Sequence, residues 1–106
     1  MSVKLPRAIK IAGVVWKVVR DRYGKSLGDD RGCSDHGTTE ITLLTSQPEH
    51  SVRSTLLHEL IHAVDTSYNP HGPNLTERQV LALETGLFAV FSDNPGLARI
   101  IFGDKA

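Results

Sequence analysis

The sequence predicts a small α+β domain, in which the first half of the chain forms a short β-sheet and the second half forms helices. Up to residue 44, short segments that alternate apolar and polar residues are separated by glycines, a pattern typical of strands. From residue 46 onward, apolar residues recur with a helical period between recognisable start and stop signals. Strands followed by helices favour a sheet with helices on one face. At 106 residues the chain is long enough for one modest core, so we expect a single domain over residues 1–106.

Three strands are expected between about residues 8 and 44. The segment Ala8–Ala12 alternates apolar and polar residues, Gly13 interrupts it, and Val14–Arg20 resumes it, which predicts a hairpin. Residues 21–38 are rich in Gly, Asp and Ser and are expected to form a loop or an irregular excursion. The β-branched, alternating segment Thr39–Leu44 predicts the third strand.

Two antiparallel helices are expected after the strands. Ser46, followed by Pro48 and Glu49, predicts a capped helix start, so the first helix should span about residues 48–68 and end before Asn69-Pro70. A turn at residues 71–74 leads to a second helix over about residues 75–93. The apolar stripe expected on this helix is Val80, Leu83, Leu87, Phe88 and Phe91. The apolar tail at residues 97–102 is expected to pack back on the core, or else to serve an interface.

The first helix contains the motif H-E-x-x-H at His58, Glu59 and His62. Histidines four residues apart lie one turn above each other on a helix face, the spacing at which two imidazoles can bind one Zn²⁺. Glu59 would then lie where it can take a proton from a zinc-bound water. The surrounding residues are apolar, so the helix should be buried, and burying these polar groups without partners would cost several kcal/mol, roughly. The ordinary alternative is a core helix whose histidines bond to backbone carbonyls.

A catalytic zinc normally takes a third protein ligand and leaves one position for water. The position six residues after His62 is Tyr68, which excludes the extended motif with a third histidine. A Glu on the second helix is the alternative, and Glu77 and Glu84 are both candidates. Glu77 could instead be the reciprocal partner of Asn74 in a capping box. Glu84 lies within the apolar stripe and has no capping role, and antiparallel geometry alone leaves the choice open.

These features together resemble a known family, the small zincin-like metallopeptidases of gluzincin type from phages, prophages and bacteria, near the ImmA/IrrE-like peptidases. The resemblance covers most of the chain. It rests on the opening Leu5–Gly13, the strand before the active-site helix, the motif itself, and a second helix that ends at Asp93-Asn94-Pro95. It implies a minimal metallopeptidase fold. It also implies that Glu77 is the third ligand, with Glu84 as the alternative.

The resemblance implies a zinc-dependent peptidase that holds one Zn²⁺ per chain through His58, His62 and Glu77. Glu59 would act as general base toward the zinc-activated water and then pass the proton to the leaving amine. Asp65 could orient the His62 imidazole, or it could simply be solvated near the helix end. Tyr68 and His71 are candidates for support of the transition state, with a structural role as the alternative for each.

The expected substrate is a peptide or protein that binds in extended form. In zincins generally, such a peptide pairs with the strand that flanks the cleft, and Thr39–Leu44 could be that edge strand or an interior one. The lone Cys33 could be an inhibitory thiol on the zinc, although a single loop cysteine is usually incidental. One cysteine also excludes an intramolecular disulfide framework.

Composition limits the partners and the location that we expect for this protein. Lys+Arg and Asp+Glu both number 12, and no basic cluster occurs, which argues against nucleic acid as the main partner. No long apolar run or signal-peptide segment is present, so we expect no membrane partner and a cytoplasmic location. The resemblance implies that the cell is bacterial or phage-infected. The alternative function is a weak or inactive zincin-like domain that acts as a protein-binding or regulatory module of phage or prophage origin. The oligomeric state stays open.

Overall fold

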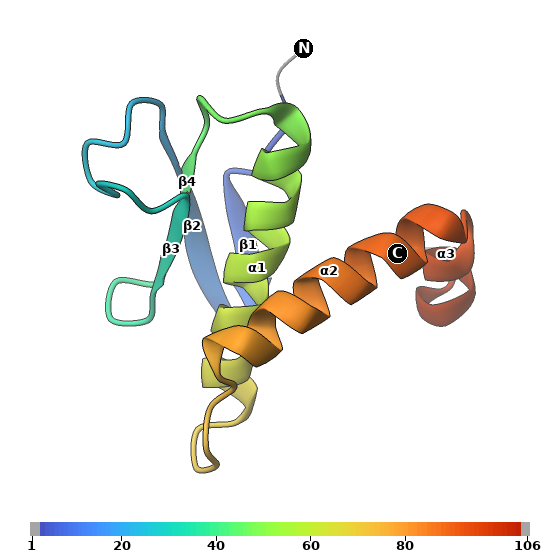
Figure 1. Ribbon diagram of the computed structural model, residues 1–106. Helices are drawn as coiled ribbons and strands as arrows, with labels where there is room; N and C mark the ends of the chain where they lie inside the picture. The colour runs from blue at the N-terminus through green and yellow to red at the C-terminus, as the bar shows by residue number, and fades with distance from the viewer. Residues whose placement is uncertain (1–2, 105–106) are drawn as a thin grey trace.

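The computed structural model describes residues 3–104, which form a small α+β domain with four strands and three helices in that range (Figure 1). The outermost residues of the predicted domain lie outside the described part. In chain order the elements are β1 (Ala8–Ile11), β2 (Val14–Asp21), β3 (Gly32–Asp35), β4 (Glu40–Leu44), α1 (Glu49–Tyr68), α2 (Glu77–Asp93) and α3 (Leu97–Phe102). The predicted fold class and the order of strands before helices are therefore confirmed.

The four strands form one mixed sheet in the order β1-β2-β4-β3. Strands β1 and β2 pair antiparallel, β2 and β4 pair parallel, and β3 and β4 pair antiparallel. The predicted hairpin is confirmed, although Ala12 belongs to its turn and not to the strand. Ala12 and Gly13 both have positive φ, 52° and 79°, as the tight turns that suit the twist of a hairpin require.

Strand β3 corrects the prediction of a loop over residues 21–38. Its sequence, Gly32-Cys33-Ser34-Asp35, contains no β-branched or aromatic residue, so no strand signal was visible. The strand forms because β4 supplies a partner: the Leu44 N–H donates to the Arg31 carbonyl at 2.9 Å, and the ladder continues to Asp35. As a result β4 is an interior strand and β3 is the edge, so of the two alternatives left open for Thr39–Leu44 the interior strand is confirmed.

Helix α1 lies against one face of the sheet (Figure 1), and the core lies between them. Its buried members come from β1, β2, β4 and α1, and they are Ile11, Trp16, Val18, Ile41, Leu43 and Ala63. Leu56 and Leu60 of α1 pack against this cluster and are only partly buried. Burial of a large aromatic side chain such as Trp16 is worth several kcal/mol, roughly, and anchors the hairpin to the sheet.

Helix α1 differs from its prediction at its start and in its burial. Pro48 is the residue before the first turn, and no side chain caps the helix, so the predicted Ser46 cap is wrong. The helix buries only the face that meets the sheet, and Val64 on the outer side is 41% exposed. A helix that is apolar nearly all round was expected to be buried on every side. Within residues 3–104, only α2 and the segment before it pack against the outer side, and they leave part of it exposed.

Helix α2 begins two residues later than predicted, because its capping box is different. The Thr76 hydroxyl accepts from the Gln79 N–H, and the Gln79 side chain accepts from the Thr76 N–H. The alternative in which Glu77 completes a capping box with Asn74 is therefore wrong, and the Glu77 carboxylate is free to act elsewhere. Of the predicted apolar stripe, only Val80 is fully buried.

Helices α2 and α3 do not cover the sheet. Figure 1 shows α2 crossing beside the lower half of α1 and then diverging from it, with α3 at the far end. Residues 97–102 therefore do not pack back on the core, and none of them is buried. The prediction of packing on the core is wrong, and this tail remains available for an interface. Within residues 3–104, no helix combines the length and the hydrophobicity needed to cross a membrane.

Candidate metal and catalytic site

His58 and His62 lie one turn apart on the face of α1 that is turned toward β3 and the start of α2. Their ring centroids are 4.9 Å apart in an edge-to-face arrangement. Both side chains are partly buried, at 14% and 28% exposed. Two imidazoles held this way by one helix present their ring nitrogens to the same small volume.

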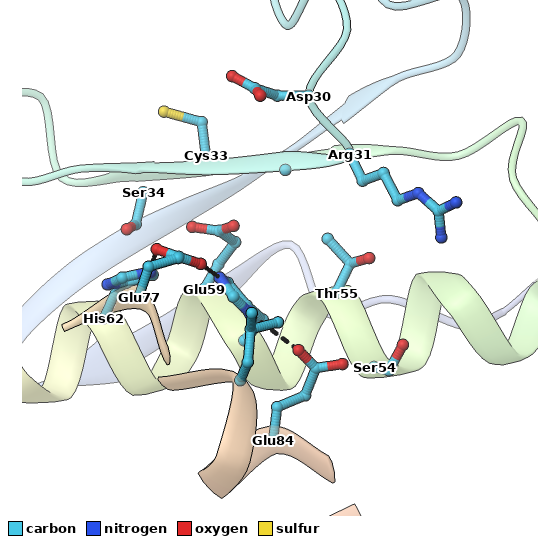
Figure 2. Close-up of a pocket in the computed structure, with 13 residues that line it drawn as sticks. Asp30, Arg31, Cys33, Ser34, Ser54, Thr55, Glu59, His62, Glu77 and Glu84 are labelled. Atoms are coloured by element: carbon cyan, nitrogen blue, oxygen red, sulfur yellow. Dashed lines mark hydrogen bonds and ion pairs between the residues drawn. The ribbon is translucent and has the colours of Figure 1, made fainter. Parts of the chain in front are cut away.

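Glu77, the first residue of α2, brings its carboxylate between the two rings. Its Oε1 lies 2.6 Å from His58 Nε2, and its Oε2 lies 3.1 Å from His62 Nε2 (Figure 2). One donor atom from each of the three residues lies within 4.8 Å of the others. This is a nitrogen, nitrogen, oxygen set of the kind that zinc binds in proteins.

Glu84 contacts the opposite nitrogen of the same ring. Its Oε1 lies 2.8 Å from His58 Nδ1, and its side chain is 18% exposed. In the absence of a metal, both contacts are hydrogen bonds when the ring carries both protons, so that Nδ1–H donates to Glu84 and Nε2–H donates to Glu77. Burial opposes protonation of His58, but the hydrogen bond to Glu84 and the charges of Glu77 and Glu59 raise its pKa overall. Glu84 thus holds the Nδ1 side of the ring, and Glu77 meets its Nε2 side.

Glu59 lies on the neighbouring face of α1 and is 7% exposed, beneath strand β3. Gly32 makes this close approach possible, because a Cβ there would lie 2.6 Å from Thr55 Cγ2 and 3.0 Å from Glu59 Cγ. Burial raises the pKa of Glu59, although His58, His62 and a hydrogen bond from the Ser34 side chain act to lower it. A buried carboxylate with a raised pKa beside two histidines is suited to accept a proton near neutrality.

These side chains share a cleft of about 580 Å³ between β3, α1 and the first half of α2. Figure 2 shows β3 running across the top of the cleft, with Ser34 pointing toward α1 and the Cys33 sulfur on the opposite side of the strand. Strand β3 and the residues before it contribute Asp30, Arg31, Gly32, Cys33 and Ser34 to the lining. Burial, together with the charges of Glu59, Asp35 and Asp30, raises the pKa of the Cys33 thiol, which disfavours the thiolate needed of a metal ligand.

Three residues considered for supporting roles lie elsewhere. Asp65 accepts from the Leu75 N–H at 2.8 Å and from the Asn69 amide at 3.4 Å, so it ties the end of α1 to the start of the next segment. The Tyr68 hydroxyl accepts from the Ala12 N–H at 3.0 Å, at the hairpin turn. His71 is in the exposed turn between the helices and does not line the cleft.

Sequence reasoning missed Gly32 and Ser34, because it assigned their segment to a loop. No pattern in the surrounding sequence shows that a glycine is needed to leave room for a carboxylate from another element. The motif at His58, Glu59 and His62 was visible because its spacing repeats within one helix. Comparisons with protein family models, curated proteins and solved structures found no match, so the function has to be inferred from the site itself.

Proposed function

We propose that this protein is a zinc-dependent peptidase of gluzincin type. The observation that supports this most directly is the meeting of His58, His62 and Glu77 at one point, with the buried Glu59 carboxylate on the adjoining helix face. A structural zinc site would complete its coordination with a fourth protein ligand, whereas a catalytic site keeps a position for water. The described residues offer a group of three, which favours catalysis.

His58 and His62 would hold zinc through Nε2, and Glu77 would hold it through its carboxylate. Glu84 would orient His58 by accepting from Nδ1, an arrangement common for metal-binding histidines. When bound, zinc would lower the pKa of a water molecule toward neutrality and polarise the scissile carbonyl. The two candidates for third ligand thus receive different roles, because they meet opposite nitrogens of one ring.

Glu59 would be the general base. It takes a proton from the attacking water and later delivers that proton to the amine that leaves. Its burial favours the protonated form more than in solution, which helps the second of these transfers. The Ser34 side chain acts to lower the pKa of the same carboxylate and Gly32 leaves room for it, so both would be positioning residues of β3.

The edge of β3 would bind the substrate backbone. In an antiparallel ladder, alternate residues turn their N–H and C=O groups toward the partner strand. Arg31 accepts from β4, so Gly32 and Ser34 turn theirs to the free edge, along the cleft. An extended peptide could pair there and gain affinity from main-chain hydrogen bonds, which favours a peptide substrate over a compact small molecule.

The test combines metal content with hydrolysis of a mixed peptide library, read by mass spectrometry. The wild-type protein should hold one zinc and cleave peptides, and Glu59→Gln should keep the zinc while hydrolysis falls by about 100- to 10,000-fold. Glu49→Gln, on the exposed start of α1, is the matched control and should cleave normally. A folded protein that does not bind zinc at neutral pH would contradict the proposal. Zinc binding with no hydrolysis at all would favour the protein-binding module instead.

A further inference from the structure

Arg31, directly before β3, is the one arginine or lysine that lines the cleft of the histidines among the residues that the structure describes. Four carboxylates share the lining with it, and they are Asp30, Glu59, Glu77 and Glu84. Figure 2 shows the Arg31 side chain at the end of the cleft where Ser54 and Thr55 lie, with His62 at the opposite end. A single cation at one end of an acidic cleft can select the charge of the group that binds there.

The Arg31 guanidinium is not used by the carboxylates around it. Within residues 3–104, it takes part in no ion pair. Asp30 is its neighbour in the chain, but Figure 2 shows the Asp30 carboxylate on the other side of the strand, turned away from the guanidinium. Glu77 and Glu84 contact the histidines instead. The donors of the guanidinium are therefore open to a ligand.

The hydroxyl groups at the same end of the cleft already have partners. The Ser54 hydroxyl donates to a backbone carbonyl of its own helix at 3.2 Å. The Thr55 hydroxyl accepts from the Gln47 side-chain amide at 3.3 Å. A bound group at this end would therefore be recognised mainly by the guanidinium, which prefers a carboxylate because the two planar groups can form paired hydrogen bonds.

The position of Arg31 sets how far from the metal site it can act. Its backbone is held by the sheet, since its carbonyl accepts from the Leu44 N–H at 2.9 Å. Along α1, Ser54 precedes His58 by one helical turn, a rise of about 6 Å. An extended peptide advances about 3.3 Å per residue, so about two or three residues separate a carbonyl at the metal site from a side chain that reaches Arg31.

We propose that Arg31 binds a carboxylate of the peptide about two or three residues from the bond that is cut, so that the substrate is an acidic peptide. This inference rests on the peptidase function proposed above. The carboxylate is either an Asp or Glu side chain or the C-terminus of the peptide, since both present the same pair of oxygens. The carboxylates of Glu59, Glu77 and Glu84 disfavour an acidic side chain near the histidines, which leaves the Arg31 end as its place.

The test selects peptides by binding and does not require hydrolysis. Immobilised Glu59→Gln protein with zinc is exposed to two mixed peptide libraries, one with free C-termini and one with amidated C-termini, and mass spectrometry identifies the retained peptides. Because Arg31 is exposed, we expect acidic residues to be enriched about three- to fivefold at one position. The enrichment should shrink as salt is added. Retention that requires a free C-terminus would identify the terminal carboxylate as the group bound.

Substitution of Arg31 in the same protein assigns the preference to this side chain. Arg31→Met should abolish the acidic enrichment, and Arg31→Glu should replace it with a preference for Lys and Arg. Arg22→Met is the matched control, because Arg22 is exposed on the loop after β2, does not line the cleft, and should leave the enrichment unchanged. Far-UV circular dichroism checks that each variant is folded.

The outcomes separate this inference from the proposed peptidase. Retention of acidic peptides that depends on Arg31, without hydrolysis by the wild-type protein, would contradict the peptidase and support the carboxylate contact. Hydrolysis with no acidic preference, or with a preference that Arg31→Met leaves unchanged, would overturn the contact alone. Where the wild-type protein cleaves, an acidic residue adjacent to the cut bond would also overturn it, because Arg31 lies too far from the histidines to reach that position.

Discussion

Glu84 and His58 are joined by a contact of 2.8 Å between Glu84 Oε1 and the Nδ1 of the ring, while Glu77 faces the Nε2 of the same ring at 2.6 Å. One imidazole thus stands between two carboxylates of α2 that are seven residues apart. The more buried carboxylate meets Nδ1, and the more exposed one meets Nε2 and the second histidine. The two glutamates are therefore not equivalent, and substituting each one should change zinc affinity to a different extent.

Zinc affinity should fall further in Glu77→Gln than in Glu84→Gln. Loss of Glu84 removes only the group that orients His58, which costs about 10- to 100-fold in affinity. Loss of Glu77 would remove the proposed third ligand, whose carboxylate contacts both histidines. Competition titration with a chelating dye measures both constants. A larger loss in Glu84→Gln would show that Glu84 is the third ligand and Glu77 is not.

The metal-free protein should gain stability at neutral pH when Glu59 becomes Gln. Burial raises the pKa of Glu59 above 4.5, so its ionisation at higher pH costs folding free energy that the unfolded chain does not incur. Below pH 4.5 the carboxyl is protonated in both states and the difference should vanish. Urea unfolding in the presence of a chelator measures this at each pH.

The matched control for that experiment is Asp29→Asn, a carboxylate on the exposed loop before β3. Its unfolding midpoint should not change relative to the wild type between acid and neutral pH. An equal midpoint for Glu59→Gln and the wild type at neutral pH would contradict the desolvation of this carboxylate. A gain in stability, with loss of hydrolysis, would be the expected signature of a residue kept for activity at a cost to folding.

Gly32→Ala should damage both stability and catalysis. The added methyl would lie 2.6 Å from Thr55 Cγ2 and 3.0 Å from Glu59 Cγ, so either α1 moves away from β3 or Glu59 shifts. Overpacking of this kind costs about 1–3 kcal/mol. Adding Thr55→Ser removes the nearest methyl and should recover part of both losses. Gly86→Ala is the control, because nothing lies within 4 Å of a Cβ there.

Tyr68→Phe should lower stability slightly and leave hydrolysis unchanged. The Tyr68 hydroxyl accepts from the Ala12 N–H at the hairpin turn, and a single exposed hydrogen bond is worth at most about 1 kcal/mol. Thermal unfolding measures the first effect, and kcat/KM on a peptide from the library measures the second. A fall in kcat with KM unchanged would instead give Tyr68 a role in the transition state.

The sequence predicted the elements that local patterns specify and missed those that depend on contacts between distant segments. The hairpin, α1 and α2 were predictable, because apolar periodicity and Gly13 act between residues close in the chain. Strand β3 was not, because its residues have no strand propensity and it exists only as a partner of β4. The position of α3 was equally hidden, since an apolar segment looks the same whether it returns to its own core or projects from it.

By itself, the sequence determined that His58, Glu59 and His62 share one helix, with the histidines one turn apart, because a helix repeats every few residues. Only the tertiary structure decided that Glu77 meets both imidazoles, that Glu84 meets the other nitrogen of His58, and that Gly32 covers Glu59. These contacts join residues of separate elements. Their distances depend on the angle at which α2 crosses α1 and on the position of β3 over α1. The crossing angle and the position of β3 result from the packing of the whole chain, and local sequence patterns do not specify that packing.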